Sequence, residues 1–288
     1  MKRLMIPVLT GIGLCFAQMA AHAQEFKEHI SKQFTLQKPA TETLVGVFNI
    51  FGSIKVEGYS GNQVMIEIDK TITADDQENL EKGKKDFKLE FEQKADSLLI
   101  YSTYPWNTRP HHRNDNIEWH EHIHYNVKLE YTVKVPFASN LWVSTVNSGN
   151  IDVKNVYGSL KTNNVNGGIT IANAKGTTIA RTVNGPVTIN YLSVPPEASN
   201  YYTLNGKLEV TYPASLSADL EFKSMNGEFY TDFPNAEVLP SKVVKTQSKN
   251  NNGTTYKLSQ NSDVRIGSGG KLFKFETLNG NIYIKKQQ

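Results

Sequence analysis

A glycine recurs at every ninth residue through the middle of the chain. Cutting the sequence at these glycines gives five units without a gap, GNIDVKNVY, GSLKTNNVN, GGITIANAK, GTTIARTVN and GPVTINYLS. Their first residues are Gly149, Gly158, Gly167, Gly176 and Gly185. An internal repeat constrains the fold strongly, because each unit must pack on its neighbours to bury its apolar side chains.

The apolar positions of a unit are its third, fifth and eighth. In the fifth unit these are Val187, Ile189 and Leu192. Residues three and five of a straight strand share one face, whereas residue eight points to the other face. If all three point inward, the chain must bend between them, and glycine permits the next bend. The pattern therefore predicts an all-β fold, a β-solenoid (β-helix) made of short strands and corners.

Asn-Gly or an equivalent pair occurs in every second unit and continues past the five units. Its spacing predicts solenoid turns of about 18 and later 21 residues. Asn-Gly is also the strongest short-range hairpin signal, so the alternative is an antiparallel β-meander or sandwich. The glycines of these pairs are Gly149, Gly167, Gly185, Gly206, Gly227 and, in the last copy TLNGNIYI, Gly280. Asn155 and Asn173 occupy equivalent positions of alternate units, and we expect their side-chain amides to form a ladder.

Strands and one short helix are expected in the N-terminal half. In YNVKLEYTVKVP, apolar and polar residues alternate from Val127 to Val135, which predicts a strand with one buried face. A helix is expected at about residues 74–86, acidic at its start and basic at its end, as the helix dipole prefers. We divide the chain into a signal peptide (1–23), a lead segment (24–43), a β-rich part with a His-rich insertion (44–140) that caps the solenoid, and the repeat region (141–288).

The first 23 residues have the features of a secretory signal peptide. Lys2 and Arg3 precede an apolar run, and Ala21 and Ala23 have the A-x-A spacing of a cleavage site. No later segment is apolar enough to span a membrane. We therefore expect an exported protein that is periplasmic, on the outer surface or secreted.

Cleavage after Ala23 would remove the single cysteine, Cys15. Disulfides, thiol catalysis and cysteine metal ligands are then excluded. The chain has 31 Lys and Arg against 28 Asp and Glu, and two of the basic residues belong to the signal peptide. A mature charge of about +1 argues against nucleic acid as a partner.

The order of motifs resembles a known family. FGSIKVEGYSGNQVMIEI, a Lys/Glu-rich helix, and YTVKVPFASNLWVSTVNSGNIDV followed by TVNG-type units are similar to the bacterial putative-adhesin family, a β-helical domain of unknown function. The resemblance covers about residues 44–285. It implies an adhesin-like architecture and no catalytic residues.

The stretch HHRNDNIEWHEHIHY is the best candidate for a metal site. His120, His122 and His124 alternate, which would place three imidazoles on one face of a strand, at a spacing that can bind zinc, nickel or copper. His111, His112 or Asp115 could complete the ligand shell. The alternatives are an exposed polar edge without a ligand, or a pH-responsive surface patch.

Catalysis finds little support in the sequence. From Val153 to Pro196 there is no Asp or Glu, which excludes a calcium ladder there and leaves few carboxylates for glycoside hydrolysis. Glu209 and Glu228 follow the Asn-Gly bends of adjacent turns and are the one carboxylate pair to examine. Exposed aromatic residues could stack on sugars, or be ordinary strand residues: Trp106, Trp119, Trp142, Tyr191, Tyr201, Tyr202, Tyr212 and Tyr230.

The function expected from these observations is non-catalytic. We predict an exported adhesin-like or envelope scaffold that presents repetitive β faces to a cell-envelope glycan or a surface protein, with no cofactor. The alternatives are a β-helix protein that binds or cleaves envelope polysaccharide, and a periplasmic module that binds a transition metal through the histidine cluster.

Overall fold

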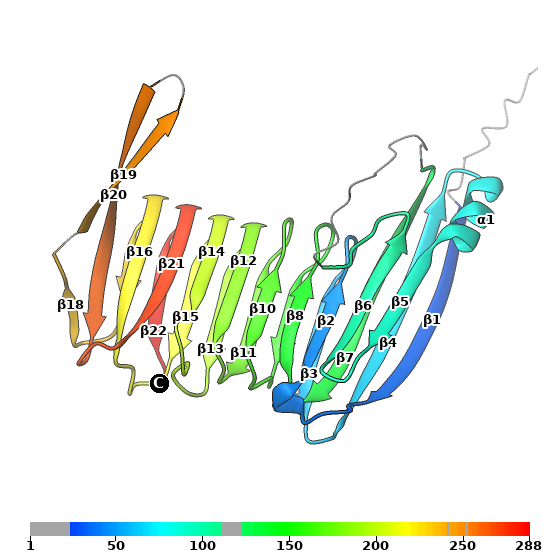
Figure 1. Ribbon diagram of the computed structural model, residues 1–288, viewed down its shortest axis with the longest axis horizontal. Coiled ribbons are helices and arrows are strands. Elements are labelled where there is room, and N and C mark those ends of the chain that lie inside the picture. The colour runs from blue at the N-terminus through cyan, green and yellow to red at the C-terminus, as the bar shows by residue number, and fades with distance from the viewer. Residues whose placement is uncertain (1–23, 111–122, 241, 251–252) are drawn as a thin grey trace, which may run out of the picture.

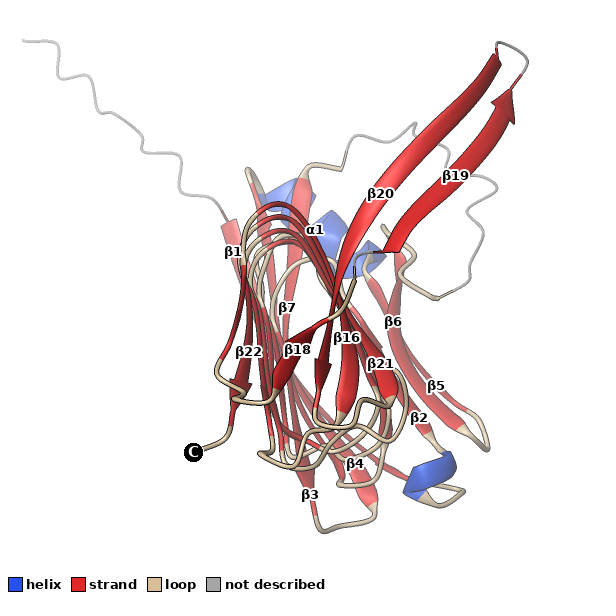
Figure 2. Ribbon diagram, turned by 90° about the vertical axis from the view of Figure 1, so that its left-hand side faces the viewer, coloured by secondary structure: helices blue, strands red, loops and turns tan. Residues whose placement is uncertain are grey.

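Two large mixed β-sheets face each other across one continuous hydrophobic core (Figures 1 and 2). The computed structural model describes residues 24–110, 123–240, 242–250 and 253–288. Almost every described element is a strand. The exceptions are a 3-10 helix, Ala40–Glu42, and the helix α1, Gln77–Asp86.

The first sheet, called here the ten-stranded sheet, contains both parallel and antiparallel pairs. β1 and β4 are antiparallel neighbours at one end, and the strands from β3 to β17 run parallel. In spatial order its strands are β1 (Gln24–Thr35), β4 (Gln63–Ala74), β7 (Tyr125–Pro136), β3 (Ile54–Tyr59), β9 (Ile151–Lys154), β11 (Ile169–Ala174), β13 (Val187–Tyr191), β15 (Leu208–Tyr212), β22 (Ile282–Lys286) and β17 (Phe229–Thr231).

The second sheet, called here the twelve-stranded sheet, has parallel strands in its centre and antiparallel pairs at both ends. In spatial order its strands are β18 (Ala236–Val238), β20 (Gly253–Ile266), β16 (Ala218–Asn226), β21 (Lys271–Asn279), β14 (Asn200–Asn205), β12 (Thr178–Asn184), β10 (Leu160–Asn163), β8 (Asn140–Ser144), β2 (Leu44–Phe48), β6 (Ser97–Tyr104) and β5 (Lys88–Gln93), with β19 (Lys242–Asn250) on β20.

The prediction of a β-solenoid is wrong. The described strands form two open sheets that pack like a sandwich, which was the alternative, and they do not form a closed coil. An antiparallel pair ends the ten-stranded sheet on the side of β1, antiparallel pairs end the twelve-stranded sheet on both sides, and the strands of the expected N-terminal cap continue both sheets. The repeat determines the spacing between parallel neighbours, such as Ile151, Ile169 and Val187. It does not require a coil that closes on itself, which is why the prediction of a solenoid failed.

The repeat glycines are required by close approach between neighbouring strands. An ideal Cβ atom on Gly185 would lie 2.3 Å from the carbonyl oxygen of Gly167, and one on Gly206 would lie 2.1 Å from the carbonyl oxygen of Gly185. Real side chains do not fit at such distances. The nearest atom to such a Cβ lies at 1.9–2.3 Å for Gly149, Gly158, Gly167, Gly176, Gly185, Gly206, Gly227 and Gly280.

The residues before these glycines have two structural roles. The hydroxyl groups of Thr182 and Thr203 each donate a hydrogen bond of 2.8 Å to the carbonyl oxygen of a glycine in the preceding layer. The Asn of each motif donates from Nδ2 to Oδ1 of the Asn in the neighbouring strand, at 2.7–2.8 Å. This asparagine ladder consists, in order, of Asn147, Asn166, Asn184, Asn205, Asn279 and Asn226. Asn-Gly is therefore a structural motif in this protein.

A second, shorter ladder confirms the expectation for the seventh repeat position. Nδ2 of Asn173 donates to Oδ1 of Asn155 over 2.8 Å. Both residues have a positive φ, 58° for Asn155 and 60° for Asn173, a conformation that Asn tolerates better than most residues. Asn155 directly follows β9, and Asn173 lies near the end of β11, where the register with β13 shifts.

The eighth repeat position points inward in only some units. Val156 and Ala174 are buried, but Val165 and Val183 are half-buried on the outer face of the molecule. Leu192 was expected in the core and is 45% exposed. The reason is that Val183 lies within a strand, β12, where position eight keeps the outward direction that strand alternation dictates.

Two local predictions are confirmed. Helix α1 begins after Asp76, whose Oδ1 accepts a hydrogen bond of 2.7 Å from the backbone N–H of Asn79, and Lys84 and Lys85 lie in its last turn. The strand β7 buries Val127, Leu129, Tyr131, Val133 and Val135, as its alternation predicts. Among the helices of residues 24–110, 123–240, 242–250 and 253–288, none is long and apolar enough to cross a membrane.

The close approach at the repeat glycines leads to a stability prediction. Gly185→Ala should lower the free energy of unfolding by about 2–3 kcal/mol, because the methyl group overlaps the Gly167 carbonyl and the strands must separate. Gly168→Ala is the matched control, since its Cβ would meet Pro186 at 3.4 Å, an ordinary contact. Urea unfolding of both variants measures the difference. Equal stability of the two variants would show that the strands do not approach as described.

Candidate functional site

The predicted metal site lies mostly outside the described residues. His120 and His122 belong to residues 111–122, as do His111, His112 and Asp115. His124 is described and is exposed, just before β7 begins at Tyr125. Within the described part of the chain, no group of three His, Cys, Asp or Glu side chains could hold a metal ion. Metal binding by His120, His122 and His124 stays a prediction.

The structure does not bring Glu209 and Glu228 together as a catalytic pair. Both lie on the outer side of the ten-stranded sheet, but strand β22 separates β15 from β17. The Glu209 carboxylate forms ion pairs with Lys285 at 2.9 Å and Lys207 at 3.1 Å. The hydrogen bond from Lys285 is the main cause of a lowered pKa of Glu209. A general acid needs the opposite shift.

The aromatic candidates divide between core and surface. Tyr191, Tyr201 and Tyr212 are buried, and their hydroxyl groups form a chain with O–O distances of 2.8 Å and 2.9 Å. Burial is the main reason why the pKa of each of these three hydroxyls is raised. These tyrosines stabilise the core and cannot touch a ligand. Tyr202 and Trp142 lie on the outer face of the twelve-stranded sheet.

Trp106 and Tyr230 also lie outside the core. Trp106 packs against Phe51, with ring centroids 5.5 Å apart. Tyr230, on β17, is 43% exposed and stacks on Tyr283 at 5.1 Å. Trp119 lies outside the described residues.

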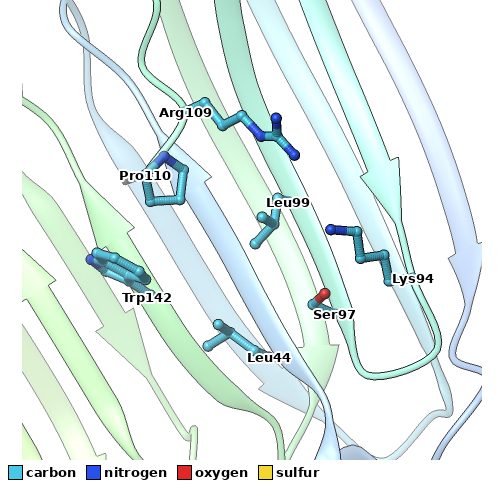
Figure 3. A pocket seen from close by; sticks show the side chains of 7 residues that line it. All are labelled: Leu44, Lys94, Ser97, Leu99, Arg109, Pro110 and Trp142. Atoms are coloured by element: carbon cyan, nitrogen blue, oxygen red, sulfur yellow. The ribbon is translucent and has the colours of Figure 1, made fainter. Parts of the chain in front are cut away.

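A hollow of about 410 Å³ lies beside Trp142 (Figure 3). We call it the Trp142 hollow. Its apolar part comes from strands β2, β6 and β8, which are adjacent and parallel in the twelve-stranded sheet. Its rim is polar and mostly cationic. The lining residues are Leu44, Lys94, Ser97, Leu99, Arg109, Pro110 and Trp142.

Gly46, which has no side chain, lies between Leu99 and Trp142, two of the residues that line the Trp142 hollow. Gly46 on β2 pairs in register with Leu99 on β6 and with Trp142 on β8. A Cβ atom on Gly46 would lie 2.7 Å from the Leu99 side chain and 2.7 Å from the Phe48 ring. Because Gly46 has no side chain, the Leu99 side chain and the Phe48 ring occupy the space beside its Cα atom. The Phe48 ring also meets Trp142 edge to face, with centroids 5.1 Å apart, which orients the indole.

Cations surround the Trp142 hollow. Nζ of Lys161 lies 3.6 Å from the centroid of the indole ring, a cation–π contact. Lys94 and Arg109 share one carboxylate, that of Glu92, at 2.8 Å and 2.9 Å. Hydrogen bonds from Lys94 and then from Tyr101 lower the pKa of Glu92, so this carboxylate stays ionised. The carboxylate of a second acidic residue, Asp96, accepts a hydrogen bond of 3.3 Å from the hydroxyl of Ser97, so the rim combines cations with carboxylates.

A second depression, of about 680 Å³, lies farther along the same sheet. We call it the Tyr202 groove. It crosses β10, β12, β14 and β21, and its residues alternate between amides, an aromatic ring and charged groups. Those that point outward include Asn163, Arg181, Asn200, Tyr202, Lys274 and Glu276.

Comparison with known proteins finds solved structures that resemble this chain only at low similarity. No family model matches the chain, and no curated protein matches it. A solved structure named putative cell adhesion protein, from Clostridium sporogenes, is 10% identical, with a TM-score of 0.38 over 90% of this chain and 100% of that one. A putative adhesin from Bacteroides fragilis has 10% identity and a TM-score of 0.30, covering 90% and 97% of the two chains. A putative lipid binding protein from Parabacteroides distasonis has 9% identity and a TM-score of 0.24, covering 91% and 97%. These values are too low to assign a function.

Sequence reasoning missed most of the Trp142 hollow. Trp142 was a candidate, but Leu44, Leu99 and Arg109 belong to no motif. They meet because β2 pairs with β6 on one side and with β8 on the other, across almost a hundred residues of chain. Only the alternation of outward residues within each strand could have indicated that they reach the surface.

His29 on the edge strand β1 contacts two carboxylates of the neighbouring strand β4. Its Nδ1 lies 2.7 Å from Oδ1 of Asp69, and its Nε2 lies 2.8 Å from Oε2 of Glu67. The hydrogen bond with Asp69 is the main cause of a raised pKa of His29, and the bond with Glu67 adds to it. The protonated imidazole thus ties β1 to β4.

The raised pKa leads to a pH prediction. The stabilising contact is complete below the ordinary histidine pKa of 6.5 and is lost as the pH rises through the higher pKa of the folded state. An NMR pH titration should give a His29 pKa above 6.5, and Asp69→Asn should move it back toward 6.5. A value at or below 6.5 in the unaltered protein would contradict the described contacts.

Proposed function

We propose that this protein is an exported, non-catalytic, adhesin-like protein that binds cell-envelope polysaccharide through the outer face of its twelve-stranded sheet. The observation that carries the proposal is the Trp142 hollow, which combines an indole and two leucines with a rim of hydrogen-bond donors. Export is proposed from the signal-peptide pattern of residues 1–23.

The chemistry of the hollow suits a sugar ring. One face of a pyranose carries C–H groups that pack against an aromatic ring, while its hydroxyl groups point outward and need polar partners. Trp142 and Leu99 offer the apolar surface, and Lys94, Ser97 and Arg109 offer the polar rim. A small apolar area with a few convergent polar groups is the usual composition of a ligand site.

The absence of catalysis is part of the proposal. Glycoside hydrolysis needs two facing carboxylates, one of them protonated near neutral pH. Glu209 and Glu228 lie on strands or bends separated by β22, and the lowered pKa of Glu209 opposes protonation. Glu92 beside the Trp142 hollow is also held ionised by its cationic neighbours. The geometry therefore favours binding over cleavage.

The shape of the sheet supports attachment to a long polymer. The Trp142 hollow and the Tyr202 groove lie on one outer face, and strand β8 of the hollow is the direct neighbour of strand β10 of the groove in the twelve-stranded sheet (Figure 1). Two weak contacts on one rigid surface add through effective concentration, so that a polymer can bind more tightly than its single sugar units.

Removal of the indole tests the proposal. Trp142→Ala should weaken binding to the polysaccharide that the unaltered protein selects on a glycan array by about tenfold, which is ~1.4 kcal/mol. Tyr230→Ala is the matched control, because it removes an exposed aromatic ring from the opposite sheet. Biolayer interferometry against the selected polysaccharide measures both variants, and circular dichroism verifies their folding.

A second variant covers the case in which Trp142→Ala does not fold. Leu99→Asn changes the opposite wall of the hollow and keeps the indole. It should also weaken binding. Unchanged binding by both Trp142→Ala and Leu99→Asn, or no binding of any polysaccharide by the unaltered protein, would refute the proposal. Release of reducing ends from the bound polysaccharide would show that the protein is an enzyme.

A further inference from the structure

Arg181 lies exposed in the middle of the Tyr202 groove. Its strand, β12, lies between β10 and β14, and its register partners are Asn163 and Tyr202. On β12 itself, the residues two positions before and two positions after Arg181 share its outer face, and they are Ile179 and Val183. The guanidinium is therefore surrounded by an amide, an aromatic ring and two aliphatic side chains.

Lys274, the other cation that lines the Tyr202 groove, forms an ion pair with a carboxylate, and Arg181 does not. Lys274 pairs with Glu221 at 3.3 Å, and Lys223 pairs with Glu276. No carboxylate of the described residues forms an ion pair with Arg181. The charge of Arg181 is thus not balanced by an ion pair with a described residue.

The neighbouring strands contain no acidic residue that could neutralise this charge. Strands β8, β10, β12 and β14 contain neither Asp nor Glu, but on their outer face they carry Lys161 and Arg181. The ten-stranded sheet differs, because its outer face has Glu57, Asp152 and Glu209 among its lysines. We call Lys161 and Arg181 the positive band. It lies on the outer face of the twelve-stranded sheet, whereas the ten-stranded sheet mixes its cations with carboxylates.

The band connects the two depressions already described. At one end of the band, Lys161 lies over Trp142. At the other end, Arg181 lies beside Tyr202. Three steps between adjacent strands separate β8 from β14, which is about 14 Å. A polymer that lies across the strands would meet an aromatic ring, two cations and a second aromatic ring.

We propose that the outer face of the twelve-stranded sheet binds acidic polysaccharide, and that Arg181 binds the carboxylate of a uronic acid unit. This inference rests on the proposed function and names its ligand class. A guanidinium presents a planar fork of donors that matches a carboxylate, and the ring of Tyr202 packs on the face of the same or the adjacent sugar. Asn163 and Asn200 are placed to bind its hydroxyl groups. Charge complementarity decides the class, because the band offers cations without carboxylates.

The experiment compares one polymer in two charge states. Polygalacturonate and the same polymer after reduction of its carboxyl groups to neutral galactan are each cast in native affinity gels at low salt. The unaltered protein should be retarded at least about threefold more by polygalacturonate, and added salt should remove the difference. Mobility in a gel without polymer is the reference for each variant.

Matched variants assign the effect to Arg181. Arg181→Gln should weaken polygalacturonate binding by about threefold to fivefold, and the ratio of polygalacturonate binding to galactan binding should fall toward one. Arg181→Lys keeps the charge without the fork and should restore only part of the binding. Lys154→Gln removes one charge from the outer face of the opposite sheet and should have no effect.

The outcomes separate this inference from the proposed function. Equal binding of polygalacturonate and galactan, or equal behaviour of Arg181→Gln and Lys154→Gln, would overturn the role of Arg181 while glycan binding through Trp142 stands. If the glycan array selects another neutral polysaccharide and the protein binds neither polygalacturonate nor galactan, the preference for acidic polysaccharide is overturned. Glycan binding through Trp142 then still stands. Retention by phosphatidylglycerol vesicles without retention by polygalacturonate would show that Arg181 binds a lipid phosphate, and would overturn it too.

Discussion

The fold depends on backbone contact between neighbouring strands at a glycine. Where the chain passes from the twelve-stranded sheet to the ten-stranded sheet, the glycine of one layer rests on the carbonyl oxygen of the glycine in the next, so closely that no Cβ atom fits. The preceding Thr or Ser binds that carbonyl oxygen, and the Asn extends the ladder. Buried backbone oxygens at the bends are thereby satisfied, as a dry interior requires. Because these three contacts recur, each strand lies in parallel register with its neighbour and the two sheets can extend.

A regular interior leaves the outer faces free to differ. Inward positions are constrained by packing between the sheets, whereas outward positions are constrained mainly by solvent and by their cross-strand neighbours. The ten-stranded sheet uses this freedom for mixed charges, such as Glu209 between Lys207 and Lys285. The centre of the twelve-stranded sheet carries aromatic rings, amides and unneutralised cations. The two faces thus have different chemistry on one scaffold: the described part of the ten-stranded sheet mixes lysines with carboxylates, whereas Lys161 and Arg181 lie on strands of the twelve-stranded sheet that contain no acidic residue.

Local sequence signals predicted local structure well. Helix α1 has its cap, its acidic start and its basic end within a few residues, so its existence needed no tertiary information. The strand β7 buries a face that its alternation specifies. The amide ladder of Asn155 and Asn173 followed from the period alone. The prediction for Leu192 failed because the direction of a residue after a strand depends on where that strand ends, and the repeat does not contain this information.

The sequence by itself determined the all-β class, the spacing between repeated strands and the positions of the repeat glycines, because all three follow from a short period in which each unit packs on its neighbours. Only the tertiary structure decided that the strands form two open sheets, since β1 pairs with β4 and β16 pairs with β20 across intervening strands of the chain. It also decided the candidate site. The Trp142 hollow needs Leu44, Leu99 and Trp142 on three adjacent strands, and that adjacency results from pairing between strands that several other elements separate in the chain, which no local pattern encodes.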